Sequence, residues 1–212
     1  MGRTSDAKER LMSATLDLIW SSSYGAVTID EICVKAGVKK GSFYYFFDSK
    51  SELAIAAVDR LWREDWKPRL DSLFSPTVEP LKRLTGYLAH LYQNQVNYKA
   101  RTGHVLGCPM CSVGSEVGAR DDRLGHKVRE LMEGKRRYIE SAIRDALAEG
   151  SIERCDPVQK ARSLCALIEG CLGEGRIMND TEPIRRLPAM AFDLLRVGSG
   201  LATLGVGANF QI

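Results

Sequence analysis

The chain has 212 residues, of which 44% are hydrophobic and 27% are charged, which is typical of a globular protein. Its formal net charge of +3 is too small to indicate nucleic-acid binding by itself. No stretch approaches the ~20 apolar residues of a membrane span, and the N-terminal run MGRTSDAKER lacks the apolar core of a signal peptide. The length allows one or two domains, and these features predict a cytoplasmic protein with no membrane partner.

Six cysteines in a chain of this length do not form the dense pattern of a disulfide-stabilised secreted domain. They are Cys33, Cys108, Cys111, Cys155, Cys165 and Cys171. Four of them fall within helical patterns, where a reduced thiol packs as a small apolar side chain. The closely spaced pair Cys108 and Cys111 is the exception.

Helical periodicity runs through the first third of the chain, and no period-two alternation indicates a strand. We expect a first helix over residues 6–22 and a short second helix that starts at Thr28. Thr28 and Glu31 have the spacing of a capping box, which satisfies the first amide groups of a helix. A third short helix over residues 39–46 and a long fourth helix over about 49–68 follow.

The rest of the chain predicts longer helices separated by proline and glycine. They cover about residues 78–99, 122–149, 157–179 and 183–197. The glycine-rich segment 101–118 is irregular, with at most a short helix after Pro109. We therefore expect an all-α fold with a helix-turn-helix domain over residues 1–50 and a larger helical domain over residues 51–212, connected by the fourth helix, about residues 49–70.

Two short helices separated by residues 36–38 form a helix-turn-helix pattern, because Gly37 permits the sharp bend between them. This geometry lets the second helix enter a DNA major groove. At about 100° per residue, its side chains divide between two faces. The inward face contains Phe43, Phe46 and Phe47. The outward face contains Lys40, Gly41, Tyr44 and Tyr45.

Local charge also favours DNA binding by this region. Four lysines and one aspartate lie in the segment from Lys35 to Lys50. Phosphate contacts require cations, hydroxyl groups and helix-start amides, and the candidates are Thr28, Lys39, Tyr44 and Lys50. Gly41 lets the backbone approach the bases, while Lys40 and Ser42 are placed to contact base edges. The alternative is a helical adaptor that does not bind DNA, in which the lysines only solvate an exposed face.

Residues 27–53 resemble the signature of the tetracycline-repressor (TetR) family nearly position by position. The resemblance implies a homodimer that binds a palindromic operator in double-stranded DNA and is controlled by a small-molecule effector bound in the C-terminal domain. The effector would release the DNA or, less commonly, promote its binding. By position, phosphate contacts are implied for Thr28, Tyr44 and Lys50. Base contacts are implied for Lys40, Gly41, Ser42 and Tyr45.

The last two long helices carry apolar stripes suited to helix packing. The first stripe contains Ala161, Leu164, Cys165, Ile168, Cys171 and Leu172, and the second contains Leu187, Ala191, Leu194 and Leu195. One interpretation is that both stripes face the chain's own core. The resemblance to the TetR family favours a dimer interface instead, since the last two helices of each subunit form a four-helix bundle in that family.

The pair Cys108 and Cys111 flanks Pro109 at the start of the short helix expected there. The positive end of a helix lowers a thiol pKa, and Cys111 would be a resolving thiol three residues away. This arrangement predicts that Cys108 senses an electrophile or an oxidant, and it resembles an element of the TetR-family branch that includes the electrophile-responsive NemR and acrylate-responsive AcuR types. The alternatives are two small packing residues, or a thiol–disulfide oxidoreductase, although no other enzyme motif appears.

An effector pocket is expected between the fourth helix and the helices that follow it. Its candidate lining residues are Trp62, Trp66, Leu88, Tyr92, Cys108, Met110, Glu116 and Tyr138. Plain core packing is the alternative for these side chains. A metal site formed by His104, Cys108 and Cys111 would lack a fourth ligand, so the sequence predicts no metal and no cofactor.

Overall fold

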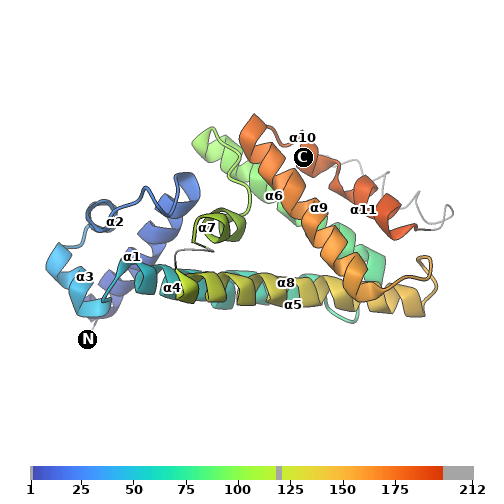
Figure 1. Cartoon of the computed structure of the whole chain (residues 1–212), viewed down its shortest axis with the longest axis horizontal. Helices are drawn as coiled ribbons and strands as arrows, with labels where there is room; N and C mark the ends of the chain where they lie inside the picture. Colours follow the sequence, from blue (N-terminus) through green and yellow to red (C-terminus); the bar gives the residue numbers. More distant parts are fainter. Residues whose placement is uncertain (1, 118–120, 198–212) are drawn as a thin grey trace. The chain divides into compact units, whose positions relative to one another are not determined.

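The computed structural model describes residues 2–117 and 121–197, and Figure 1 labels its helices in chain order. Within these residues, β-structure is limited to an isolated antiparallel bridge between Ile152 and Val197. The predicted all-α fold class is therefore confirmed. None of the described helices is long and apolar enough to cross a membrane.

The chain divides into two compact units, and each unit is built from two separate stretches of sequence. Unit 1 contains Met1–Pro68 and Pro109–Met132, and unit 2 contains Arg69–Cys108 and Glu133–Ile212. This division differs from the expected boundary at residue 50, because α7 (Pro109–Val117) packs against α1. Periodicity along the chain carries no information on a contact between such distant segments.

Unit 1 begins with α1 (Gly2–Ser21), α2 (Ile29–Ala36), α3 (Lys40–Phe46) and α4 (Lys50–Leu61). Each of these helices begins within a few residues of its predicted start. Their inward faces share a core that contains Leu11, Val27, Ile32, Phe43, Phe47, Leu53 and Ala57. Burial of one large apolar side chain contributes about 1.5–3 kcal/mol, so this cluster fixes the short helices against one another.

Local hydrogen bonds define where these helices begin and end. Thr28 Oγ1 accepts a hydrogen bond from the Glu31 N–H at 3.2 Å, and the Glu31 carboxylate accepts one from the Thr28 N–H at 2.7 Å. This geometry confirms the predicted capping box. Gly37 has φ = 61°, a left-handed conformation that L side chains rarely adopt, and ends α2 with a sharp turn. Ser49 caps α4 by accepting from the Glu52 N–H at 3.1 Å.

The long fourth helix contains a wide turn. α4 continues through the π-helix η1 (Trp62–Trp66) into α5 (Lys67–Leu73), so the helical segment extends a few residues past its predicted end. In η1 the Lys67 N–H donates to the carbonyl oxygen of Trp62, five residues earlier. The Pro68 ring would clash with the carbonyl group four residues earlier in a regular α-helix, and a π-type turn relieves that clash.

Unit 2 contains α6 (Pro80–Thr102), α9 (Pro157–Met178), α10 (Glu182–Arg185), α11 (Leu187–Leu195) and the second half of α8 (Asp122–Ala148). α10 and α11 pack against both α6 and α9 (Figure 1). One helix was expected over residues 183–197, whereas the structure has two short helices there. Pro188 has no N–H with which to continue the hydrogen bonding of α10, and a new helix starts beside it.

Candidate functional site

The outward face of α3 is exposed, and its inward face is buried. Phe43 and Phe47 are covered by the core of unit 1 and Phe46 is half-buried against it, whereas 53% of Tyr44 and 73% of Tyr45 is exposed to solvent. The predicted separation of the two faces is therefore confirmed. Exposed tyrosine hydroxyl groups and rings are suitable partners for phosphates and base edges.

The first turn of α3 exposes cations and bare backbone. Lys39 precedes the helix as its N-cap residue, and Gly41 has no heavy atom within 4 Å of the place where a Cβ would lie. The Lys40 ammonium group pairs with Asp30 of α2 at 2.8 Å, and this hydrogen bond raises the Lys40 pKa. Asp30 thereby orients Lys40 on the exposed surface of α2 and α3. Ser42, the remaining predicted base contact on this turn, is half-buried.

Lys50 was expected to contact a DNA phosphate, but in the structure it binds backbone groups of its own chain. Its Nζ donates to the carbonyl oxygens of Tyr24 and Val27, both at 2.8 Å, and lies 4.4 Å from the centre of the Tyr24 ring. Burial lowers the pKa of this ammonium group. Lys50 therefore anchors the loop between α1 and α2 to the first turn of α4.

Glu116 of α7 binds the same loop. Its two carboxylate oxygens accept hydrogen bonds from the backbone N–H groups of Tyr24 at 3.2 Å and Gly25 at 2.6 Å. This contact corrects the expectation that Glu116 lines an effector pocket, because its carboxylate is directed at the backbone of the loop. Through Glu116, α7 becomes a structural part of the helix-turn-helix unit.

A buried amide side chain holds the segment that precedes Cys108. Gln95 Oε1 accepts hydrogen bonds from the N–H groups of Leu106 at 3.1 Å and Gly107 at 2.9 Å, and Gln95 Nε2 donates to the Gly107 carbonyl at 3.2 Å. Gly107 has φ = 68°, and a Cβ there would lie 3.1 Å from the carbonyl oxygen of Leu172. Glycine fits this position without strain, so the backbone fixes where Cys108 lies in unit 2.

Cys108 faces a group of buried polar side chains in unit 2. Its Sγ lies within 4.8 Å of a carboxylate oxygen of Glu169, which forms an ion pair with Lys135. Burial acts to lower the Lys135 pKa, but the neighbouring Tyr87, Cys108 and Glu169 groups outweigh it and hold that pKa well above its usual range. Burial also raises the pKa of Tyr87, so its hydroxyl group stays neutral. The ion pair with Glu169, next to Cys108, therefore favours the charged form of Lys135.

The eight residues expected to line an effector pocket divide between the two units. Trp62, Trp66, Met110 and Glu116 belong to unit 1, and Leu88, Tyr92, Cys108 and Tyr138 belong to unit 2. Leu88 and Met110 are buried in the core, which favours packing for both. Tyr138 donates its hydroxyl hydrogen to Asp71, and burial together with this hydrogen bond raises the Tyr138 pKa to about 12. Trp62, Trp66 and Tyr92 are half-buried.

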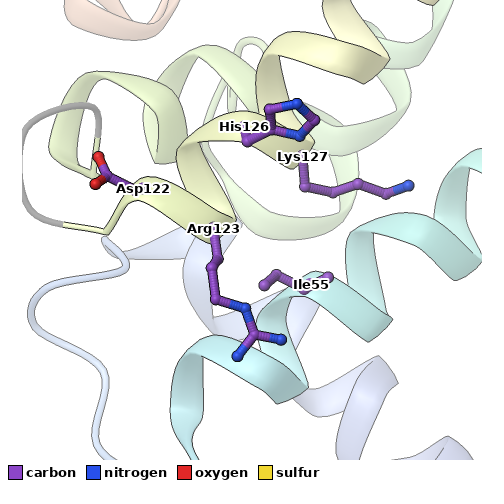
Figure 2. Close-up of a pocket in the computed structure, with 5 residues that line it drawn as sticks. All are labelled: Ile55, Asp122, Arg123, His126 and Lys127. Atoms are coloured by element: carbon purple, nitrogen blue, oxygen red, sulfur yellow. The ribbon is translucent and has the colours of Figure 1, made fainter.

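A surface pocket of about 410 Å³ lies in unit 1, and none of those eight residues lines it. Its lining residues are Ile55 of α4 and Asp122, Arg123, His126 and Lys127 of α8 (Figure 2). Arg123 extends toward α4, as Figure 2 shows. Lys127 forms ion pairs with Asp59 at 2.6 Å and Glu130 at 3.2 Å. The pocket forms between helices that are distant along the chain, so the sequence contains no sign of it.

Seven of the eight side chains expected at the dimer interface are buried within the chain itself. They are Leu164, Ile168, Cys171, Leu172, Leu187, Ala191 and Leu195. A side chain that its own chain covers is not available to a second copy, so the interface expectation is corrected and these residues belong to the core of unit 2. Only Leu194 of the eight is half-buried. The exposed face of α9 is a different one and includes Ile177, of which 83% is exposed.

Sequence reasoning missed the buried polar residues around Cys108. Lys135 continues the inward stripe of α8 that contains Val128, Leu131 and Ile139, where an apolar side chain is expected. Gln95 likewise stands on the buried side of α6. A charged or amide side chain on an apolar face indicates a buried hydrogen-bond partner. That signal was present in the sequence, but it does not identify the partner.

Comparison with known proteins assigns the family of the chain. Residues 11–57 match the model for bacterial regulatory proteins of the tetR family, and residues 80–191 match the tetracyclin repressor-like C-terminal domain. The HTH-type transcriptional repressor NemR of Escherichia coli K12 is 26% identical over 184 residues, which cover 84% of this chain and 88% of NemR. The transcriptional regulator AcuR of Cereibacter sphaeroides is 27% identical over 180 residues, which cover 84% of this chain and 80% of AcuR.

A solved structure has the same fold. The crystal structure of reduced E. coli NemR matches with a TM-score of 0.78 at 23% identity, covering 92% of this chain and 99% of that chain. The resemblance to the TetR family and to its NemR- and AcuR-like branch is confirmed. The chain therefore belongs to the tetR family of bacterial regulatory proteins, and it is a DNA-binding transcriptional regulator rather than an enzyme.

Proposed function

We propose that this regulator is a cytoplasmic repressor that binds a palindromic operator as a homodimer and is released by a small-molecule effector. The exposed face of α3 is the observation that carries the DNA-binding part of this proposal. Tyr44 and Tyr45 are uncovered there, while Phe43 anchors the same helix in the core. In helix-turn-helix dimers, two such helices enter successive major grooves about one turn of DNA apart, which requires a palindromic site.

The DNA contacts that we propose lie on this surface. Lys39 and Tyr44 bind phosphates, and Thr28 adds a phosphate contact at the start of α2, where its hydroxyl group is already bonded to Glu31 at 2.8 Å. The base-facing residues are Lys40, Gly41, Ser42 and Tyr45. The Asp30 carboxylate holds Lys40 and limits which bases the Lys40 ammonium group reaches.

Selection of binding sites from a random double-stranded DNA library tests this proposal. We expect the wild-type protein to enrich an inverted repeat. Tyr45→Ala should change or weaken the enriched sequence, because a lost base contact costs about 1–3 kcal/mol. Arg137→Ala, at an exposed position of α8, is the control and should enrich the wild-type sequence. Enrichment of a site without two-fold symmetry would contradict the proposed mode of binding.

The dimer interface that we propose lies on the exposed face of α9 and α11. Ile177 and Met178 are large apolar side chains with 83% and 67% of their surface exposed, and Met190 of α11 is also exposed. At Gly170 of α9, a Cβ would meet no atom within 4 Å, so the helix surface is open there. Packing of this face against a second copy removes these apolar groups from water.

The effector site that we propose includes Cys108, which reacts with a small electrophile. Cys108 is 9% exposed, which favours a small reagent. The next residue is Pro109, the first residue of α7, and α7 carries Glu116 to the loop between α1 and α2. A change at Cys108 is thus transmitted along the chain into the helix-turn-helix unit. Cys111, half-buried in α7, is the resolving thiol when the reagent is an oxidant.

Treatment with N-ethylmaleimide tests the role of Cys108. We expect the treated wild-type protein to lose at least about tenfold in affinity for its operator, measured by fluorescence anisotropy. Cys108→Ser should keep its affinity after the same treatment, whereas the control Cys155→Ser should lose it as the wild type does. Equal losses in the wild type and Cys108→Ser would assign the control of DNA binding to another site.

A further inference from the structure

A buried ion pair between Lys135 and Glu169 lies next to Cys108 in unit 2. Only 7% of the Lys135 side chain and 15% of the Glu169 side chain is exposed. Removing two charges from water costs several kcal/mol per ion, and well-packed apolar residues often replace such a pair without loss of stability. We therefore consider a functional role for the Lys135–Glu169 pair.

Several titratable groups face the Lys135 ammonium group from two helices and one connecting segment. They are Tyr87 of α6, Cys108, and Cys165 and Glu169 of α9. Tyr87 is neutral, because burial raises its pKa. Burial also raises the pKa of Cys165, although Lys135 acts in the opposite direction.

Of the groups named, Glu169 and Cys108 are the two that we consider as sources of a negative charge for the ammonium group. Glu169 does so in the structure, where it forms the ion pair. Cys108 Sγ lies within 4.8 Å of the same carboxylate. One cation therefore has two possible anionic partners, and the partners lie next to each other.

We propose that Lys135 is the counter-ion of the Cys108 thiolate and that Glu169 competes with the thiolate for this ammonium group. The proposal rests on the proposed function, in which Cys108 is the reactive thiol. With Glu169 bound to Lys135, a thiolate would be a second negative charge in a buried site, so the thiol keeps its proton. When Glu169 withdraws, the thiol loses its proton to solvent, and the thiolate pairs with Lys135.

The reactive step then follows from the charge on sulfur. The Cys108 thiolate attacks the electrophilic carbon; with iodoacetamide, a C–S bond forms, the C–I bond breaks and iodide leaves. An opposite charge within about 4–6 Å shifts a pKa by about 1–3 pH units, and a like charge shifts it in the other direction. The positive charge of Lys135 therefore favours the Cys108 thiolate, and the negative charge of Glu169 disfavours it.

The rate of Cys108 alkylation against pH measures this competition. The intact protein is treated with iodoacetamide in the presence of EDTA from pH 5.5 to 9.5, and modification at Cys108 itself is followed by fragmentation mass spectrometry, which distinguishes it from modification at Cys111 on the same peptide. In Glu169→Gln, we expect the midpoint of the rate profile to lie at least about one pH unit below that of the wild type. In Lys135→Met, we expect it at least about one pH unit above. If one of these variants does not fold, the shift in the midpoint of the other variant tests the proposal by itself.

At a fixed pH, the alkylation rate should increase less than the shift in the midpoint alone would suggest. A thiolate of lower pKa is more abundant at pH 6.5 but also less nucleophilic, so Glu169→Gln should react only about threefold faster there. Lys82→Met removes an exposed ammonium group of α6 that pairs with Glu79, and it is the matched control. Its profile should equal that of the wild type. Cys165→Ala should also leave the profile unchanged, since Cys165 is not the reacting thiol.

Unchanged midpoints in Glu169→Gln or in Lys135→Met would overturn the counter-ion proposal. Parallel measurement of operator affinity separates this failure from failure of the proposed function. If alkylated wild type releases DNA but the midpoints do not move, Cys108 is the sensor and Lys135 does not control it. If the midpoints move as expected but alkylation leaves DNA binding intact, the counter-ion role stands and sensing at Cys108 is excluded.

Discussion

Three lysines of the helix-turn-helix region have three different environments. Lys39 stands at the start of α3, Lys40 is paired with Asp30, and Lys50 is bonded to the carbonyl oxygens of Tyr24 and Val27. Each residue type suits a phosphate contact, but its partners decide how much of the charge reaches the DNA. The role of each lysine therefore depends on the groups that its ammonium group contacts.

Substitution of Lys50 should affect stability more than the electrostatics of DNA binding. Each hydrogen bond to a charged group contributes about 1.5–3 kcal/mol, so Lys50→Ala should lower the Tm by several degrees and leave the salt dependence of DNA affinity nearly unchanged. Lys39→Ala is the counterpart: its Tm should not change, and the log–log salt slope should fall by about one. Thermal unfolding and anisotropy titrations at several salt concentrations measure both. A reduced log–log salt slope for Lys50→Ala would show that Lys50 does contact a phosphate.

Gly107 and Gly103 allow a matched test of the segment before Cys108. Both have positive φ, at 68° and 77°, but a Cβ at Gly103 would meet no atom within 4 Å, whereas one at Gly107 would press on the Leu172 carbonyl. Gly103→Ala should cost about 1–2 kcal/mol for the backbone conformation alone. Gly107→Ala should cost at least about 1 kcal/mol more, because overpacking adds to that strain. Urea unfolding measures the difference, and equal losses would mean that the Gly107 contact relaxes freely.

The helix α7 is the element through which the proposed sensor Cys108 is joined to the helix-turn-helix unit. It packs against α1, and Glu116 fixes the loop that leads from α1 into α2. It also begins immediately after Cys108, at Pro109. A nine-residue helix thus connects the thiol to the part of the molecule that binds DNA.

Removal of the Glu116 carboxylate should loosen the loop between α1 and α2. Each lost hydrogen bond to a charged group costs about 1.5–3 kcal/mol, so amide exchange at Tyr24 and Gly25 should accelerate at least tenfold in Glu116→Ala. Ser115→Ala changes the neighbouring exposed residue and should leave exchange at both amides as in the wild type. Hydrogen exchange followed by NMR gives the rates. Unaltered protection in Glu116→Ala would show that Lys50 holds the loop without help.

At the scale of the whole molecule, two continuous helical segments pass from unit 1 into unit 2. The segment α4–η1–α5 crosses the division at Pro68, and α8 crosses it at Met132. Each unit nevertheless has its own buried core, with Phe43 central in unit 1 and Ile168 fully buried in unit 2. The two units are therefore connected by continuous helices as well as by the segment at Cys108 and Pro109.

Charge on the exposed face of α9 should separate the copies without unfolding them. Ile177 makes little contact within its own chain, so Ile177→Glu should leave the Tm of a dilute monomer unchanged while shifting sedimentation from dimer to monomer. Specific operator binding should be lost with the dimer, because two half-sites must be read together. Glu149→Lys, at the exposed end of α8, is the control for altered charge. A dimeric Ile177→Glu protein would place the interface on another face.

The amino-acid sequence by itself determined the fold class, the helix-turn-helix region and most helix ends. Periodicity, the Thr28–Glu31 box and the left-handed Gly37 act over a few residues, so they can be recognised along the chain. The inward and outward faces of α3 were likewise predictable, because a helix has a fixed angle per residue.

The tertiary structure alone decided which of two faces α9 buries, what Lys50 and Glu116 bind, and which charges surround Cys108. In each case the deciding partner lies outside the element itself: α10 and α11 for α9, Tyr24 for Glu116, and Lys135 with Glu169 for the thiol. An apolar stripe has the same pattern whether its own chain or a second copy covers it. Similarly, a lysine or glutamate has the same local pattern whether it meets solvent, DNA or a backbone carbonyl, because hydrogen bonds and ion pairs depend on distance in space.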